Sequence, residues 1–168
     1  MSARSRFLKR PGLCGLFVML LAGTPAGEAA LTITTDHQTI AFGVMQLGEE
    51  KRLAQLGSYQ NQITCSSTNG QSWSLKMHLL QPLSSGAETI PLDQFTWQAT
   101  SPNGHGVLAS PNQFTPFSLA PQTVYISGAD EASGDAVTVQ FTYSLRVPDE
   151  QVSGIYQTII RFTLTELL

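Results

Sequence analysis

The chain has 168 residues, a formal net charge of −3 at neutral pH and 42% hydrophobic residues. This is the composition of a globular protein, and its acidic balance argues against nucleic acid or an anionic lipid surface as the main partner. The GxSxG, HExxH and P-loop patterns of common catalytic sites do not occur in the sequence. We therefore expect a protein that is not an enzyme and that uses no cofactor.

The N-terminal segment, residues 1–29, has the features of a secretory signal peptide. Four basic residues and no acid precede an apolar run at Leu13–Ala22, and small residues follow in "GTPAGEAA". The run of 10 residues is shorter than the roughly 20 that cross a bilayer as a helix, so we expect no transmembrane segment in the mature chain. Cleavage after Ala29 leaves small residues at −1 and −3, whereas cleavage after Ala30 would leave Glu28 at −3. The alternative is an uncleaved N-terminal anchor.

Residues 30–168 are then the mature chain, whose length suits one domain. This part holds five Lys and Arg residues against eleven Asp and Glu residues, a formal charge of −6. Cys65 is its only cysteine, so an internal disulfide is impossible even though an exported protein meets oxidising conditions. We expect Cys65 to be buried and inert, and the alternative is a reactive or intermolecular thiol.

The first half of the mature chain contains several strand-like segments. Residues 31–42 and 51–56 are weak strands, although "GEEKRLAQLG" is also compatible with one helical turn. Asn69-Gly70 separates two strand-like runs and predicts a hairpin turn, because both central residues of such a turn need a positive φ. The arm after this turn alternates, with Trp73, Leu75, Met77 and Leu79 on one face and Ser74, Lys76 and His78 on the other.

The second half shows the clearest alternation. Residues 95–100 and 123–127 are weak strands, and "QPLSSGAETIP", "SPNGHG" and "SPNQFTPF" read as loops. In "AVTVQFTYSLRVP" apolar residues occupy every second position from Val137 to Val147, which predicts one buried and one solvated face. We expect "PDEQVSG" to be a tight turn, so that residues 136–147 and 155–166 form a hairpin whose final strand is paired on both sides.

These seven to nine short strands predict an all-β fold, a single antiparallel β-sandwich that is immunoglobulin-like or jelly-roll in outline. A closed barrel is the alternative. The fold would occupy residues 30–168, after the cleaved signal peptide at residues 1–29.

No catalytic or metal-binding constellation emerges from the spacing of the polar residues. The histidines (His37, His78 and His105) lie far apart in the sequence, whereas zinc ligands usually come in close pairs. The acidic pairs at 49–50, 130–131 and 149–150 are adjacent residues in loops, which suits solvated charges better than two carboxylates facing one bond. The loop "SGADEASGD" (127–135) lacks the ligand spacing of a calcium loop. We therefore expect no catalytic, cofactor-binding or metal-binding residues.

Two stretches, "GQSWSLKMHLLQPL" and "VPDEQVSGIYQTIIRFTLTE", together resemble the WxL-type bacterial surface domain. That family has a Trp-x-Leu after a glycine turn and a C-terminal strand reading Gly-x-Tyr-x-x-x-Ile-x-Trp-x-Leu. The residues that match or replace the motif here are Trp73, Leu75, Gly154, Tyr156, Ile160, Phe162 and Leu164, with Phe162 standing where the family has its second Trp. The resemblance implies a secreted, non-catalytic protein that associates with a cell-wall polymer or with other envelope proteins.

The same final strand also resembles the end of chaperone-assembled fimbrial subunits. In those proteins the terminal strand is recognised by an assembly chaperone, and a strand from a neighbour completes the fold. Either resemblance implies export to the cell surface, the periplasm or the medium. Core packing alone also accounts for the motif residues, because those on one strand are spaced two apart and share one face. For a glycan or peptide surface we would look at the loops "SPNGHG" and "SSGAE", and at Tyr59 and Trp97 as exposed aromatic residues.

Overall fold

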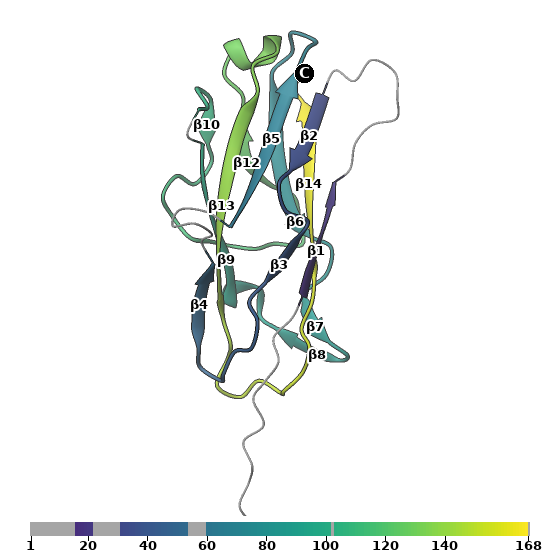
Figure 1. Ribbon diagram of the computed structural model, residues 1–168, viewed down its shortest axis with the longest axis vertical. Coiled ribbons are helices and arrows are strands. Elements are labelled where there is room, and N and C mark those ends of the chain that lie inside the picture. The colour runs from purple at the N-terminus through teal and green to yellow at the C-terminus, as the bar shows by residue number, and fades with distance from the viewer. Residues whose placement is uncertain (1–15, 22–30, 54–59, 102, 168) are drawn as a thin grey trace, which may run out of the picture.

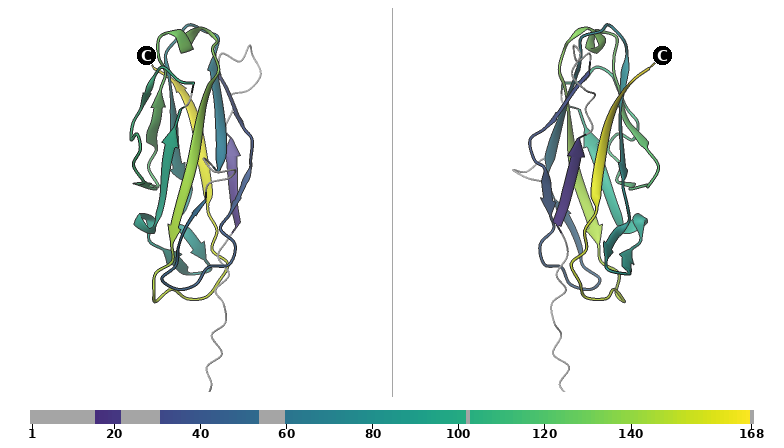
Figure 2. Two further views of the ribbon diagram at one scale, coloured as in Figure 1. Left: turned by 60° about the vertical axis from the view of Figure 1, so that its left-hand side comes forward. Right: turned by 90° about the vertical axis from the view of Figure 1, so that its right-hand side faces the viewer.

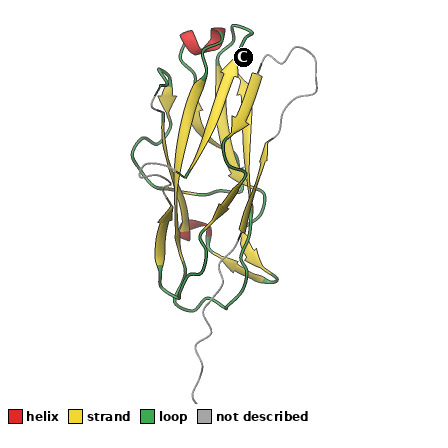
Figure 3. Cartoon of the chain, viewed as in Figure 1, coloured by secondary structure: helices red, strands yellow, loops and turns green. Residues whose placement is uncertain are grey.

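The computed structural model describes residues 16–21, 31–53, 60–101 and 103–167. Its strands are β1 (Leu16–Leu21), β2 (Leu31–Thr35), β3 (Thr39–Ala41), β4 (Glu50–Leu53), β5 (Asn61–Ser67), β6 (Trp73–Leu79), β7 (Leu83–Ser85), β8 (Glu88–Ile90), β9 (Phe95–Thr100), β10 (Val107–Leu108), β11 (Thr115–Pro116), β12 (Gln122–Ile126), β13 (Val137–Arg146) and β14 (Ile159–Glu166). Two short 3-10 turns, η1 (Leu92–Gln94) and η2 (Asp130–Ser133), are the helical elements of this part of the chain (Figure 3).

The strands form two main sheets that pack face to face along the length of the molecule (Figures 1 and 2). One sheet, here called the β14 sheet, has the order β10-β12-β6-β14-β1-β3. The other, the β13 sheet, has the order β11-β9-β13-β5-β2, and β4 also pairs with β13. The all-β sandwich expected from the sequence is therefore confirmed.

The core lies between the two sheets and is rich in aromatic residues. Side chains from the inner faces meet there, as where the Phe141 ring of β13 lies edge-on to the Phe162 ring of β14 at 5.2 Å between centroids. The alternation predicted for residues 137–147 is confirmed, because the apolar positions from Val137 to Val147 are buried and Arg146 is exposed. On β6, Trp73, Leu75, Met77 and Leu79 are likewise buried. Period-2 alternation thus identified the inward face of β6 and β13 correctly, although Ser74 and Ser144 on the opposite faces are also buried.

Both hairpins predicted from turn residues are wrong. The strands on either side of Asn69-Gly70 lie in different sheets, since β5 pairs with β13 and β2, and β6 pairs with β12 and β14. Gly70 has a positive φ of 73°, but Asn69 does not, so the two-residue turn is not formed. Residues 136–147 and 155–166 are not a hairpin either, because β13 and β14 belong to opposite sheets. Residues 147–158 cross between the sheets instead of making a tight turn.

Other differences from expectation are local. The stretch 31–42 is two strands, because β2 joins the β13 sheet and β3 joins the β14 sheet. Residues 50–53 form β4 rather than a helical turn, and residues 54–56 of the predicted strand lie outside the described residues. The segment 81–91, expected to be a loop, contains the β7–β8 hairpin.

Candidate functional site: a strand slot between β3 and β14

The final strand β14 is paired on both sides only over residues 159–162, its neighbours are not the predicted ones, and one of them, β1, lies outside the predicted mature chain. On one side it is antiparallel to β6, from Ile160 opposite Leu79 to Glu166 opposite Trp73. On the other side β1 runs parallel to it, with Val18 opposite Ile159 and Leu21 opposite Phe162. The right-hand view of Figure 2 shows the purple β1 beside the yellow β14.

β1 fills a position between two strands from opposite ends of the chain. Its other edge pairs antiparallel with β3, where Leu16 is opposite Ala41 and Val18 is opposite Thr39. In the β14 sheet, β1 is the link between β3 and β14. We call the position that β1 occupies the strand slot. It is bounded by β3 and by residues 159–162 of β14.

The residues that occupy the strand slot belong to the predicted signal peptide. β1 is "LFVMLL", and these six residues lie inside the apolar run Leu13–Ala22. Cleavage after Ala29 would therefore remove β1 from the sheet. The backbone N–H and C=O groups that β3 and β14 turn toward β1 would lose their partners, and an unpaired edge of this kind is a template for another strand.

The walls of the strand slot lie next to the hydrophobic core. Ile40 on β3 and Ile160 and Phe162 on β14 are each at most 1% exposed. The register places Phe17 opposite Ile40, Met19 opposite Ile160 and Leu21 opposite Phe162. Alternate positions of a strand in the slot thus lie on the core side of the sheet. An occupant with apolar residues at these three positions suits the site.

The outward face beside the strand slot is basic. Arg161 of β14 lies opposite His78 of the neighbouring β6, and Lys76 lies two pairs further along, opposite Thr163. All three side chains are half-buried. Desolvation lowers the pKa of His78, and the positive charge of Arg161 lowers it further. Arg161 and Lys76 therefore concentrate positive charge on this face of a protein that is acidic as a whole, and His78, with its lowered pKa, adds less to it.

The residues that carry the WxL-type resemblance lie close together in the structure, where they are part of the hydrophobic core. The pairing of β6 with β14 places Leu75 opposite Leu164, so the two stretches that carry the resemblance are neighbouring strands. The motif side chains that are at most 3% exposed are Trp73, Leu75, Tyr156, Ile160 and Phe162, and Leu164 is partly buried. Gly154 packs so closely on β7 that an added Cβ would lie 2.5 Å from the Ser85 Oγ. These contacts account for the motif as packing.

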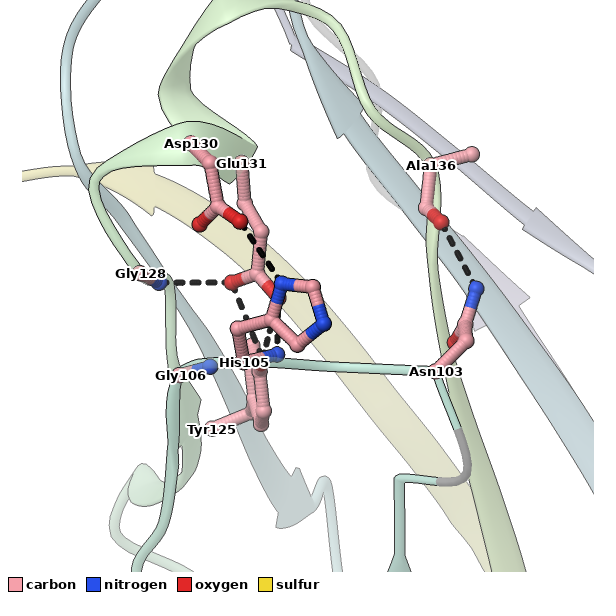
Figure 4. A network of polar contacts seen from close by, with 8 residues as sticks. All are labelled: Asn103, His105, Gly106, Tyr125, Gly128, Asp130, Glu131 and Ala136. Atoms are coloured by element: carbon pink, nitrogen blue, oxygen red, sulfur yellow. Dashed lines mark hydrogen bonds and ion pairs between the residues drawn. The ribbon is translucent and has the colours of Figure 1, made fainter.

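A second polar cluster, which the sequence did not predict, lies at the end of the sandwich that carries η2 (Figure 4). The Glu131 side chain is only 2% exposed. Its carboxylate accepts hydrogen bonds from the Tyr125 hydroxyl at 2.7 Å and from the His105 and Gly128 backbone N–H groups at 2.6 Å each. The Trp73 Nε1 donates to the Glu131 carbonyl oxygen at 3.3 Å. Glu131 thus joins strand β12 and the loops at His105 and Gly128 to the start of β6.

This arrangement suits a structural role better than a catalytic one. The carboxylate already has protein donors on both oxygens, and the Tyr125 hydroxyl also accepts from the Gly106 N–H at 2.7 Å. Burial and the hydrogen bond to Glu131 raise the pKa of Tyr125, so it remains a neutral donor near neutral pH. Over the described residues, no group of three or more His, Cys, Asp or Glu side chains is placed to hold a metal ion.

His105 is exposed and pairs with Asp130 through Nδ1 and Oδ2 at 2.6 Å. This hydrogen bond raises the pKa of His105 and lowers the pKa of Asp130. The His105 contribution to stability is present below the pKa of the unfolded histidine and is lost as pH rises through the folded pKa. The Asp130 contribution is present above its unfolded pKa and is lost as pH falls through the folded pKa. The charged pair therefore exists in the window between the two folded pKa values.

We expect the histidines to titrate in a fixed order when followed by NMR. The midpoint of His105 should lie above that of a histidine in an unfolded peptide, and the midpoint of His78 should lie below it. Asp130→Asn should lower the His105 midpoint and leave that of His78 unchanged. Arg161→Gln should raise the His78 midpoint alone. Equal midpoints for the two residues would contradict both assignments.

The remaining candidate residues are placed as follows. Cys65 is buried and free, as predicted, and burial raises the pKa of its thiol to about 12. Trp97, expected as an exposed aromatic residue, is 1% exposed, because its inward position on β9 packs it near Phe141. Tyr59 lies outside the described residues. None of the helices in the described ranges has the length and apolarity needed to cross a membrane.

A comparison with models of known protein families finds no match, and a comparison with curated proteins finds no similar sequence.

Proposed function

We propose that this chain is an exported, non-catalytic subunit of the bacterial envelope whose β14 sheet is completed by a strand from another polypeptide. The observation that carries the proposal is the identity of the strand between β3 and β14. That strand is "LFVMLL", the apolar centre of a segment with the features of a cleaved signal peptide. Export would remove the strand, and the folded protein would need a replacement.

The size of the vacated edge supports this assignment. β1 pairs with β14 over four residues and with β3 over three, so its loss leaves two facing strand edges beside a buried core. Exposed apolar edges of this kind aggregate unless they are covered. An extended segment that adds to both edges supplies the missing backbone hydrogen bonds, and pockets for its alternate side chains give selectivity. This role corresponds to the fimbrial resemblance of the final strand.

The test compares residues 30–168 alone with the same residues refolded in the presence of a peptide spanning residues 14–23. We expect the chain alone to aggregate or to unfold at a markedly lower temperature, and the peptide to restore a soluble monomeric complex. The matched control is the same peptide with Met19→Asp, which places a charge opposite Ile160. Mass spectrometry of the exported protein establishes the cleavage site. Retention of residues 16–21, or a peptide-free chain as stable as the full chain, would count against the proposal.

Cell-wall association, implied by the WxL-type resemblance, is the second candidate. The specific support is that the two motif-bearing stretches are adjacent strands, with Leu75 opposite Leu164. Because the motif side chains are buried, binding to a wall polymer would use other surfaces, such as the β7–β8 hairpin and the loop at residues 103–106. Sedimentation of the exported protein with purified cell wall tests this role. Protein that stays entirely in the supernatant would exclude it.

A further inference from the structure

The basic face beside the strand slot has no acidic partner within the described part of the chain. Arg161, His78 and Lys76 form no ion pair with any of the described residues. The Arg161 Nε and the His78 Nδ1 are also buried without a hydrogen-bond partner among the described residues. A buried donor on the charged guanidinium of Arg161 is costly unless another group satisfies it, and the His78 Nδ1 is a second buried polar atom without a partner among the described residues. They mark a place where a partner's acceptor would be stabilising.

The register identifies the position from which an occupant of the strand slot would reach these charges. Arg161 is the Cα partner of Leu20, between the pairs formed by Met19 with Ile160 and by Leu21 with Phe162. Opposite residues of paired strands lie on the same side of a sheet, and neighbours along a strand lie on opposite sides. Ile160 and Phe162 are buried, so the position opposite Arg161 lies on the outward face.

We propose that the strand slot recognises a segment of another polypeptide that runs parallel to β14, is apolar opposite Ile160 and Phe162, and is acidic opposite Arg161. This inference rests on the proposed function and names the partner chemistry of the same site. β1 fulfils the apolar part of the pattern but has Leu20 at the position of the acid. β1 can therefore supply apolar residues opposite Ile160 and Phe162, but it offers no acid to neutralise Arg161. A strand with Asp or Glu there gains a cross-strand ion pair in addition.

Charge complementarity favours a strand over a free anionic polymer as the ligand of this face. Arg161 is on β14, the strand that forms one wall of the slot, and His78 and Lys76 are on β6, the next strand of the sheet. A carboxylate carried by the occupant would be held at one register position by the backbone ladder. A free polyanion would instead need only the charges, and its binding would not depend on the apolar positions.

The experiment measures, by fluorescence anisotropy, the binding of fluorescent peptides to residues 30–168 that are refolded in their presence. The peptides span residues 14–23 and carry Leu20→Glu, Leu20→Gln or Leu20→Lys. We expect the Glu peptide to bind about three- to tenfold more tightly than the Lys peptide, with the Gln peptide between them. This difference should shrink as salt is raised, because part of the pair is solvated.

Variants of the protein assign the effect to Arg161. Arg161→Glu should invert the order of the three peptides, and Arg161→Gln should flatten it, so the test does not depend on one variant folding. The matched control is Arg146→Glu, a charge reversal at an exposed position of β13 in the other sheet, which should leave the order unchanged. An order that is unaffected by Arg161→Glu would overturn the inference.

The remaining outcomes separate this inference from the proposed function. Equal binding of the three peptides overturns the acidic position and leaves strand completion standing. Failure of every peptide, including the unmodified one, removes the proposed function itself. A peptide that combines Leu20→Glu with Met19→Asp should not bind. If it binds as well as the Leu20→Glu peptide, the basic face recognises free anions and the strand partner is excluded.

Discussion

Deletion of residues 158–168 is expected to prevent folding, because it removes the strand that holds the centre of one sheet. β14 lies between β6 and β1, and its side chains Ile160 and Phe162 are at most 1% exposed. Loss of a buried side chain of this size costs about 2–5 kcal/mol, and two such losses match the 5–15 kcal/mol total stability of a typical domain. The truncated chain should be aggregated or disordered by circular dichroism and size-exclusion chromatography.

Two milder variants distinguish the effect of losing β14 from the effect of shortening the C-terminus. Phe162→Ala should lower the free energy of unfolding by about 3–5 kcal/mol, because the ring also contacts Phe141 across the two sheets. Removal of residues 167–168 is the matched control. It deletes the backbone hydrogen bond from Leu167 to Ser72 and leaves the strand intact, so it should cost about 1 kcal/mol. A soluble, monomeric and fully stable chain without residues 158–168 would refute this account.

Glu131→Ala is expected to destabilise the protein by about 3–5 kcal/mol, since it leaves several buried donors without an acceptor. The carboxylate serves the Tyr125 hydroxyl and the backbone N–H groups of His105 and Gly128. An orphaned buried donor costs about 1–3 kcal/mol, and a charged acceptor makes each bond stronger than a neutral one. Chemical denaturation measures the loss, and tryptophan fluorescence reports on Trp73, whose indole N–H bonds to the Glu131 carbonyl oxygen.

Two neighbouring substitutions control for charge and for loop composition. Glu131→Gln keeps the shape but turns one acceptor oxygen into a donor, so about 1–3 kcal/mol of the loss should remain. Asp135→Ala changes an exposed acid in the same loop and should stay within about 0.5 kcal/mol of the wild type. If Glu131→Ala behaves like Asp135→Ala, the network of Figure 4 contributes little to stability.

Alternation along the chain was enough to predict that the fold is all-β and which faces are buried. Val137 to Val147 and Trp73 to Leu79 alternate in the sequence and point inward in the structure. This works because the side-chain period of a strand is two, whatever its neighbours are. The burial of Cys65 follows from the same preference of apolar groups for the interior.

Strand pairing, in contrast, could not be predicted from the amino-acid sequence. The turn signals at Asn69-Gly70 and in "PDEQVSG" predicted hairpins, yet each connection crosses from one sheet to the other. A strand with one apolar face is stable in either layer of a sandwich, because both inner faces border the same core. Alternation therefore specifies which side chains of a strand are buried, but it does not specify which strand pairs with it.

Neither the buried Glu131 cluster nor the strand slot could be predicted from the sequence, and the physical reason is the same for both. Glu131 sits in a Gly- and Ser-rich loop, and only the approach of Tyr125 and of the loop at residues 103–106 makes it a buried acceptor. "LFVMLL" reads as the apolar centre of a signal peptide, and a short apolar run looks the same whether it meets a membrane or a sheet edge. The local period and the polarity of each segment can be read from its amino acids alone. The tertiary structure decided which segments meet, because contacts between distant residues depend on how the whole core closes.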